Sequence, residues 1–159
     1  MSSGLTDKLI LIVENEANPA LSVRDWAYGS SITPVFVSSG LEALLWLGKG
    51  NLPDAILADA GMEQLNGVDF VKTLAQSGFF HEIPVLVFGP PQFHPVLAGM
   101  RQAGAKDHVF LPVDGEELSI RLSGLLKTSS IEILTSTAKK EMVLLQRESS
   151  ISKFGFPNS

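Results

Sequence analysis

Five short runs of apolar residues recur along the chain, and segments with helical spacing separate them. The runs cover Leu9–Val13, Thr33–Val37, Ala55–Ala58, Pro84–Phe88 and Val109–Val113. Each run is almost continuously apolar, which is typical of strands that are buried on both faces of a parallel sheet. Because crossover helices join parallel neighbours, this alternation predicts a doubly wound α/β domain with helices on both faces.

Capping residues mark where the helices are expected to begin and end. Asn18 and Pro19 offer an N-cap followed by a proline at the first helical position. Gly104 suits the left-handed residue that ends a helix. Residues with an acidic partner three positions later, as in a capping box, are Ser39, Asn66 and Asp114. Five strands with these helices fit the flavodoxin-like order 2-1-3-4-5, which satisfies the right-handed crossover rule.

The pattern changes near residue 127. Residues 8–127 hold the predicted sheet domain, and residues 148–159 predict a flexible tail. Residues 128–147 predict an amphipathic helix, because apolar side chains three and four positions apart share one face. These side chains are Ile131, Leu134, Ala138, Met142 and Leu145. That face either packs back on the domain, forms a contact surface or begins a connector to a further domain.

Composition excludes several classes of function. The chain has 159 residues, enough for one domain, and no cysteine, which rules out disulfides and thiolate metal sites. Its formal net charge of −5 opposes nonspecific nucleic-acid binding, which depends on Lys and Arg. No apolar run approaches the roughly 18 residues of a membrane span, and the N-terminus lacks the layout of a signal peptide. We therefore expect a cytoplasmic domain without nucleic-acid or membrane partners.

Common enzyme motifs are missing from the sequence. No glycine-rich dinucleotide fingerprint follows the first strand, and there is neither a Walker-type lysine loop nor a Gly-x-Ser-x-Gly nucleophile elbow. His81, His94 and His108 lack the close spacing of zinc ligands. An organic cofactor and a zinc site are therefore not expected.

Acidic residues stand where two of the expected strands end. Glu14, Asn15 and Glu16 follow the first strand, and Asp59 follows the third. The carboxyl ends of parallel strands form the edge where open α/β sheets bind ligands, so these groups can converge. Carboxylate and amide oxygens suit a hard cation such as Mg²⁺. A metal-dependent α/β enzyme that uses Glu14, Glu16 and Asp59 is one function compatible with this pattern.

Four segments, in order, resemble the receiver domain of response regulators (CheY-like). They are residues 9–16 (LILIVENE), 54–67 (DAILADAGMEQLNG), 83–89 (IPVLVFG) and 103–112 (AGAKDHVFLP). The resemblance extends without gaps over about residues 8–126. It implies a signalling domain of a two-component system rather than an enzyme, apart from Mg²⁺-dependent self-phosphorylation from a phosphodonor.

The resemblance also implies a role for each site residue. Asp59 takes the place of the aspartate that accepts a phosphoryl group from a partner sensor histidine kinase. Mg²⁺ would be held by Glu14, Asn15, Asp59 and the backbone carbonyl of Gly61, with Glu16 as a further candidate. Phosphoryl transfer of this kind depends mostly on positioning and charge neutralisation.

Three positions of the switch machinery depart from the receiver pattern. Gly89 replaces a hydroxyl residue, Leu111 replaces a lysine, and His108 replaces an aromatic residue. Asn15 also removes one carboxylate from the acid pair, which weakens Mg²⁺ binding. We therefore expect a degenerate receiver whose phosphorylation switch at Asp59 is weakened or lost. The alternative is a functional phosphoacceptor.

Such a receiver would act through protein contacts, with a sensor histidine kinase, another signalling protein or a second copy of itself. Leu41, Leu44 and Leu45 share one face of their expected helix, and Trp46 and Leu47 widen that apolar stripe. Most of the stripe is expected to pack on the sheet, with one of Leu45 and Trp46 left exposed as a contact. Arg101 and Arg121 fall on the side where receivers commonly pair.

Overall fold

A five-stranded parallel sheet forms the centre of the domain. The computed structural model describes residues 4–15, 17, 19–62 and 64–126. The sheet has the order β2-β1-β3-β4-β5, which confirms the predicted flavodoxin-like architecture. Its strands are β1 (Leu9–Val13), β2 (Thr33–Val37), β3 (Ala55–Asp59), β4 (Val85–Gly89) and β5 (Asp107–Phe110).

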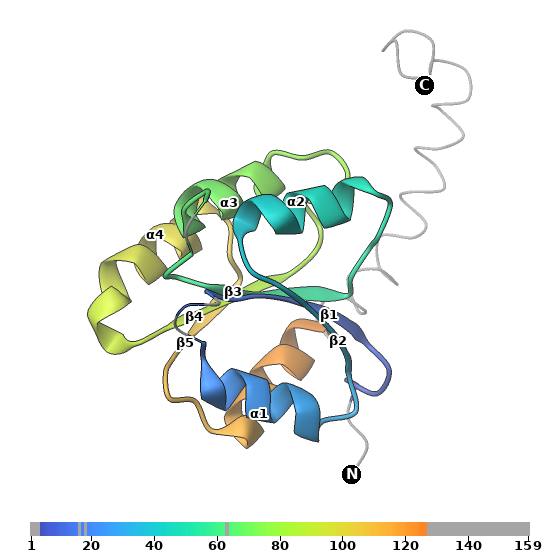
Figure 1. The fold of residues 1–159 in the computed structure, drawn as a ribbon, viewed down its shortest axis with the longest axis vertical. Coiled ribbons are helices and arrows are strands. Elements are labelled where there is room, and N and C mark those ends of the chain that lie inside the picture. Colours follow the sequence, from blue (N-terminus) through green and yellow to red (C-terminus); the bar gives the residue numbers. More distant parts are fainter. Residues whose placement is uncertain (1–3, 16, 18, 63, 127–159) are drawn as a thin grey trace, which may run out of the picture. The chain divides into compact units, whose positions relative to one another are not determined.

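Helices cover both faces of this sheet (Figure 1). The helices are α1 (Leu21–Gly29), α2 (Gly40–Gly48), α3 (Gly67–Ala75), the 3₁₀ helix η1 (Pro91–Phe93), α4 (His94–Ala103) and a helix over residues 115–126. In Figure 1, α1 and the orange helix 115–126 lie on one face, and α2, α3 and α4 lie on the other. None of the helices among the described residues is long and apolar enough to cross a bilayer.

Two hydrophobic cores follow from this layering. Successive side chains of a strand point to opposite faces, so Ile10 and Ile12 of β1 pack with α1 and residues 115–126. Leu11 and Val13 pack on the other face with α2, α3 and α4. The central strands are therefore buried on both sides, as their continuous apolar sequence predicts.

Several predicted helix ends are confirmed. Ser39 is the N-cap of α2 and accepts a hydrogen bond from the backbone N–H of Glu42 at 3.0 Å. Asn66 caps α3 in the same way through Asp69. Gly104 follows α4 with a φ of +136°, a conformation that favours glycine.

Two predicted boundaries are wrong. The first helix begins at Leu21 with Ala20 as its N-cap, because the carbonyl of Ala20 accepts the first hydrogen bonds, from Val23 and Arg24. The last strand covers Asp107–Phe110 rather than Val109–Val113. It ends before Pro112, which has no N–H to contribute to the ladder.

The apolar face predicted for α2 is confirmed for Leu44 and Leu47, which pack in the core, and wrong for Leu41. Gly40, Ala43 and Leu47 are the buried residues of this helix. Leu41 is exposed, and Leu45 exposes 62% of its surface, whereas Trp46 is half-buried. Exposure of Leu45 was one of the two outcomes expected. The predicted helix over 128–147 and the tail over 148–159 lie outside the described residues and stay predictions.

Candidate functional site

The carboxyl ends of β1 and β3 bring together three of the predicted site residues. The two strands run in register, with Val13 opposite Ala58, so the residues that follow them are neighbours. The backbone N–H of Asn15 donates to Oδ2 of Asp59 at 3.3 Å. The side chain of Asn15 contacts Gly61 in the loop after β3. Asn15, Asp59 and Gly61 therefore form one cluster.

Asp59 is a buried carboxylate held by backbone groups. Only 6% of its surface is exposed. Its Oδ1 accepts a hydrogen bond from the N–H of Gly61 at 2.8 Å, in addition to the bond from Asn15 to Oδ2. Burial raises the pKa of Asp59, and the two backbone hydrogen bonds, which favour the charged form, oppose that rise. The carboxylate is thus fixed in orientation by the chain itself.

The amide of Asn15 has both of its ends engaged. Its Nδ2 donates to the carbonyl oxygen of Gly61 at 3.1 Å, and its Oδ1 accepts from the N–H of Ala17 at 2.9 Å. If the amide were turned over, its Nδ2 would face the N–H of Ala17 and its Oδ1 would face the carbonyl oxygen of Gly61. These two neighbours therefore determine the orientation of the amide. A hydrogen-bond donor therefore points at the carbonyl that the receiver resemblance assigns to a cation.

Glu14 is directed toward a different set of residues. Only 2% of it is exposed, and its Oε1 forms an ion pair with Nε of Arg24 on α1. Its Oε2 is buried and has no hydrogen-bond partner within the described part of the chain. Glu14 lines a pocket of about 130 Å³ whose other lining residues are Arg24, Phe36, Val37, Ser38 and Glu42. Hydrogen bonds from the backbone and hydroxyl of Ser38 lower the pKa of Glu42.

These contacts decide how far the site fits a divalent cation. The Gly61 carbonyl and the Asn15 oxygen already accept hydrogen bonds, and Glu14 is paired with Arg24. Among the residues described, no three acidic or histidine side chains come together as a metal site. Glu16, the further candidate ligand, lies outside the described residues. The residues that the structure describes at this site, arranged in this way, do not fit Mg²⁺.

An aromatic side chain that the sequence analysis did not single out covers the site. Phe93 of η1 packs against Gly61, where a Cβ would lie 3.1 Å from Cε2 of the ring. A Cβ at Gly89 would lie 3.5 Å from Cβ of Phe93 and 3.1 Å from Cβ of Ala60. Phe93 therefore bridges the loops after β3 and β4 beside Asp59. Its position two residues after Pro91, in the segment that follows the fourth strand, was the only signal in the sequence.

Leu111 follows β5 and contributes an apolar surface. Its N–H donates to the carbonyl of Gly89 at 2.9 Å, which places it beside the end of β4. Its half-buried side chain packs against the core that contains α1. The position that the resemblance assigns to a lysine thus carries no charge.

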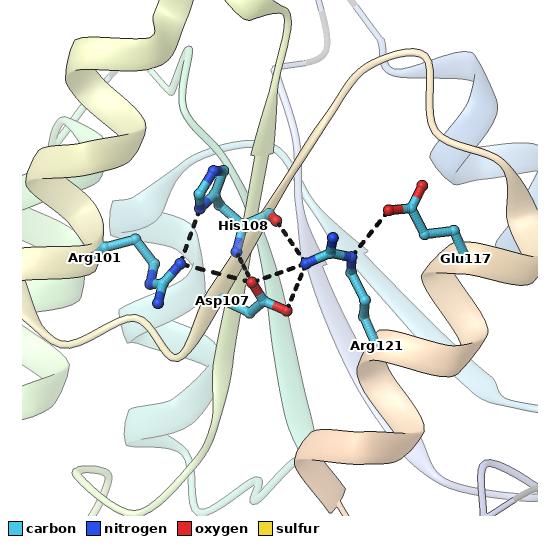
Figure 2. Close-up of polar contacts among 5 residues, drawn as sticks. All are labelled: Arg101, Asp107, His108, Glu117 and Arg121. Carbon is cyan, nitrogen blue, oxygen red and sulfur yellow. Dashed lines mark hydrogen bonds and ion pairs between the residues drawn. The ribbon is translucent and has the colours of Figure 1, made fainter.

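His108 belongs to a polar group on the outer side of β5, shown in Figure 2. Arg121 donates from Nη1 to both oxygens of Asp107, at 3.1 and 3.0 Å, and from Nε to Glu117 at 3.0 Å. Arg101 approaches Asp107 from α4 on the opposite side and donates to Nδ1 of His108 at 2.9 Å. The hydrogen bond to Asp107 is the main cause that raises the pKa of Arg121. We call Arg101, Asp107, His108, Glu117 and Arg121 the β5 polar group.

Comparisons with known proteins agree with this architecture. Residues 10–123 match the family described as the response regulator receiver domain. The regulator of RpoS from Escherichia coli K12 is 30% identical over 113 residues, which are 71% of this chain and 33% of that protein. The alkaline phosphatase synthesis transcriptional regulatory protein PhoP of Bacillus subtilis is 27% identical over 135 residues, 85% of this chain and 55% of that protein. The chain thus spans between a third and somewhat over half the length of these relatives.

A solved structure shows the same fold. The receiver domain of the sensor histidine kinase PA1611 from Pseudomonas aeruginosa superposes with a TM-score of 0.68 at 19% identity, over 77% of this chain and 99% of that one. That receiver has a magnesium ion coordinated in its active-site cleft.

Proposed function

The chain belongs to the response regulator receiver family, and on that premise we propose that its phosphorylation switch at Asp59 is weakened or lost and that it acts through protein–protein contacts. A receiver domain of two-component signalling is what the family match and the relatives establish. The metal-dependent enzyme that uses Glu14, Glu16 and Asp59 is not supported. The cytoplasmic location and the weakened Mg²⁺ site expected from the sequence belong to this proposal.

The packing of Phe93 carries the proposal. Its ring lies against Gly61, and its Cβ is close to the point where a side chain at position 89 would begin. These are the loops between which a phosphoryl group on Asp59 would have to fit. An apolar ring offers no hydrogen bond to phosphoryl oxygens.

The absence of polar side chains at Gly89 and Leu111 also supports a weakened or lost phosphorylation switch. Neither Gly89 nor Leu111 can donate a side-chain hydrogen bond, and Leu111 packs toward the core. A hydrogen bond to a charged group contributes about 1.5–3 kcal/mol. Without two such contacts, a phosphorylated state gains little over the unphosphorylated one, so the switch has little driving force.

Surfaces for protein contacts remain on the domain. The β5 polar group lies at the surface between α4 and residues 115–126 (Figure 2), and Leu41 and Leu45 expose apolar surface on α2. Exposed large apolar residues often mark an interaction site. The partner is a sensor histidine kinase, another signalling protein or a second copy of this chain.

A functional phosphoacceptor is the second candidate, and the geometry of Asp59 favours it. Both carboxylate oxygens are oriented by backbone N–H groups, with one bond of 2.8 Å from Gly61. A nucleophile fixed in this way requires little reorganisation before it attacks a phosphodonor.

Intact mass spectrometry distinguishes the two candidates. The protein is incubated with Mg²⁺ and acetyl phosphate, and Asp59→Asn serves as the control. We expect no added phosphoryl group on the wild type. A gain of one phosphoryl group that disappears in Asp59→Asn would contradict the proposal.

A second variant tests the physical explanation. Phe93→Ala combined with Leu111→Lys uncovers the site and supplies a cation. We expect this double variant to retain more phosphoryl group than the wild type. An unchanged amount, in a variant whose circular dichroism spectrum matches the wild type, would show that the ring and the missing lysine are not the cause.

A further inference from the structure

We infer that Arg24 and the amide of Asn15 together take the place of a divalent cation beside Glu14 and Asp59, which we call the acidic edge. Arg24 supplies the positive charge and Asn15 a neutral hydrogen-bond donor, so that this receiver holds the edge together without metal. The inference rests on the proposed function, in which Asp59 does not switch. It assigns Arg24 and Asn15 a positioning role.

The first step concerns Asn15. Its Nδ2 donates to the Gly61 carbonyl, and its Oδ1 accepts from Ala17. A cation at that carbonyl would lie next to the Nδ2 donor, and turning the amide to present its oxygen instead would leave the N–H of Ala17 without this acceptor. Each of these bonds contributes about 1 kcal/mol. The amide thus supplies a neutral donor at the point where a cation would coordinate.

The second step concerns Glu14. A buried carboxylate needs a positive partner, because the cost of removing it from water is several kcal/mol. Arg24 supplies that partner through Nε. The guanidinium carbon also lies 5.9 Å from the ring centroid of Phe36, and stacking over an aromatic face favours a cation. Arg24 is therefore held on both sides while 36% of its side chain stays exposed.

The third step is the separation of the two acids. Asp59 receives its hydrogen bonds from Gly61 and Asn15, whereas Glu14 lines a pocket with residues of α1, β2 and α2. Glu42 is the other carboxylate that lines this pocket, and Asp59 does not line it. Glu14 and Asp59 thus each have an internal partner of their own, and one bridging ion is not required.

Thermal unfolding with and without Mg²⁺ tests the role of Arg24. The wild type, Arg24→Gln, Glu14→Gln/Arg24→Gln and Arg101→Gln are compared in MgCl₂ and in NaCl of equal ionic strength. We expect Mg²⁺ to raise the unfolding midpoint of Arg24→Gln, whose Glu14 lacks a cation. The other three proteins should show no specific rise. A rise in the wild type equal to that in Arg24→Gln would overturn the inference.

Calorimetric titration with Mg²⁺ tests Asn15 without disturbing the ion pair. Asn15→Asp restores a carboxylate at the Gly61 carbonyl, and Gln102→Glu adds the same charge at an exposed position on α4. We expect Asn15→Asp to bind Mg²⁺ at least about tenfold more tightly than the wild type, which is about 1.4 kcal/mol. Equal affinities of Asn15→Asp and the wild type would overturn this part of the inference.

The two readouts separate this inference from the proposed function. Phosphorylation of wild-type Asp59 in a protein that does not bind Mg²⁺ would overturn the proposed function and leave the metal-free edge intact. Tight Mg²⁺ binding by a wild type that acetyl phosphate does not modify would overturn the inference and the weakened Mg²⁺ site, and would leave the proposed loss of switching at Asp59 intact.

Discussion

Two acidic groups of this domain, Asp59 and Asp107, differ in whether charged side chains hold them: Asp59 has backbone donors, whereas Asp107 is also paired with arginines. Asp59 is 6% exposed, and backbone N–H groups of Gly61 and Asn15 hold it. The side chain of Asp107 is 24% exposed; one backbone N–H, that of His108, donates to it at 2.8 Å, and its other partners are the long side chains of Arg101 and Arg121 (Figure 2). Backbone donors are fixed by the fold, whereas exposed arginines can be redirected at little cost.

The difference shows where the molecule can respond to a partner. The acidic edge at β1 and β3 is buried, and its groups depend on one another, so a change there affects stability. The β5 polar group lies at the surface, where solvent and salt screen ion pairs and each pair contributes little to stability. Its arginines can therefore exchange an internal partner for a partner protein's carboxylate without unfolding the domain.

The largest contrast is expected between two arginine truncations. Arg24→Ala leaves the buried Glu14 without a positive partner, and breaking a buried pair costs about 3–5 kcal/mol. Because Arg24 is about a third exposed, we expect the lower end, about 3 kcal/mol. Arg101→Ala should cost less than about 1 kcal/mol. Urea unfolding of both variants measures the difference, and equal losses would contradict the contrast.

A second contrast compares two glycines. Gly89→Ala brings a Cβ to 3.1 Å from Cβ of Ala60, and overpacking of this kind costs about 1–3 kcal/mol. At Gly48 in α2 a Cβ meets nothing within 4 Å, so Gly48→Ala should stabilise the domain by about 0.5–1 kcal/mol. Chemical denaturation gives both values. If adding Ala60→Gly to Gly89→Ala does not restore the lost stability, the close approach to Ala60 is not the cause of that loss.

The next contrast depends on pH. Burial raises the pKa of Asp59 above its ordinary value of 3.8, so the folded state binds this proton more tightly than the unfolded state. The free energy of unfolding of the wild type, relative to Asp59→Asn, should therefore fall as pH rises from 3.8 through the raised pKa, and stay level above it. Denaturation of both proteins across this window measures the effect. A relative stability that increases with pH would mean that the hydrogen bonds outweigh burial.

The smallest effect is expected in the β5 polar group. Glu117 and Arg121 are one helical turn apart and form an exposed ion pair. Pairs of this type contribute about 0.3–0.5 kcal/mol. Glu117→Gln should therefore lower the free energy of unfolding by no more than that, and high salt should remove the difference. A larger, salt-independent loss would show that this group is part of the stable framework.

Much of the fold followed from local sequence. Continuous apolar runs identified the five strands, and Ser39, Asn66 and Gly104 marked helix ends through hydrogen bonds and dihedral preferences that act within a few residues. The wrong predictions arose where packing against residues far away in the sequence decides which side chains are buried. The face of α2 that covers the sheet uses the small residues Gly40 and Ala43 together with Leu47, whereas hydrophobicity alone also favours leucines that are exposed, such as Leu41 and Leu45.

The sequence by itself determined the receiver fold, the place of Asp59 at the end of β3 and the loss of polar side chains at Gly89 and Leu111. Those features depend on residue identity and on the order of strands. Only the tertiary structure decided that Glu14 pairs with Arg24, that Asn15 donates to Gly61 and that Phe93 covers the loop beside Asp59. Such contacts depend on side-chain orientation between residues up to about 46 positions apart, and the packing of the folded domain selects that orientation.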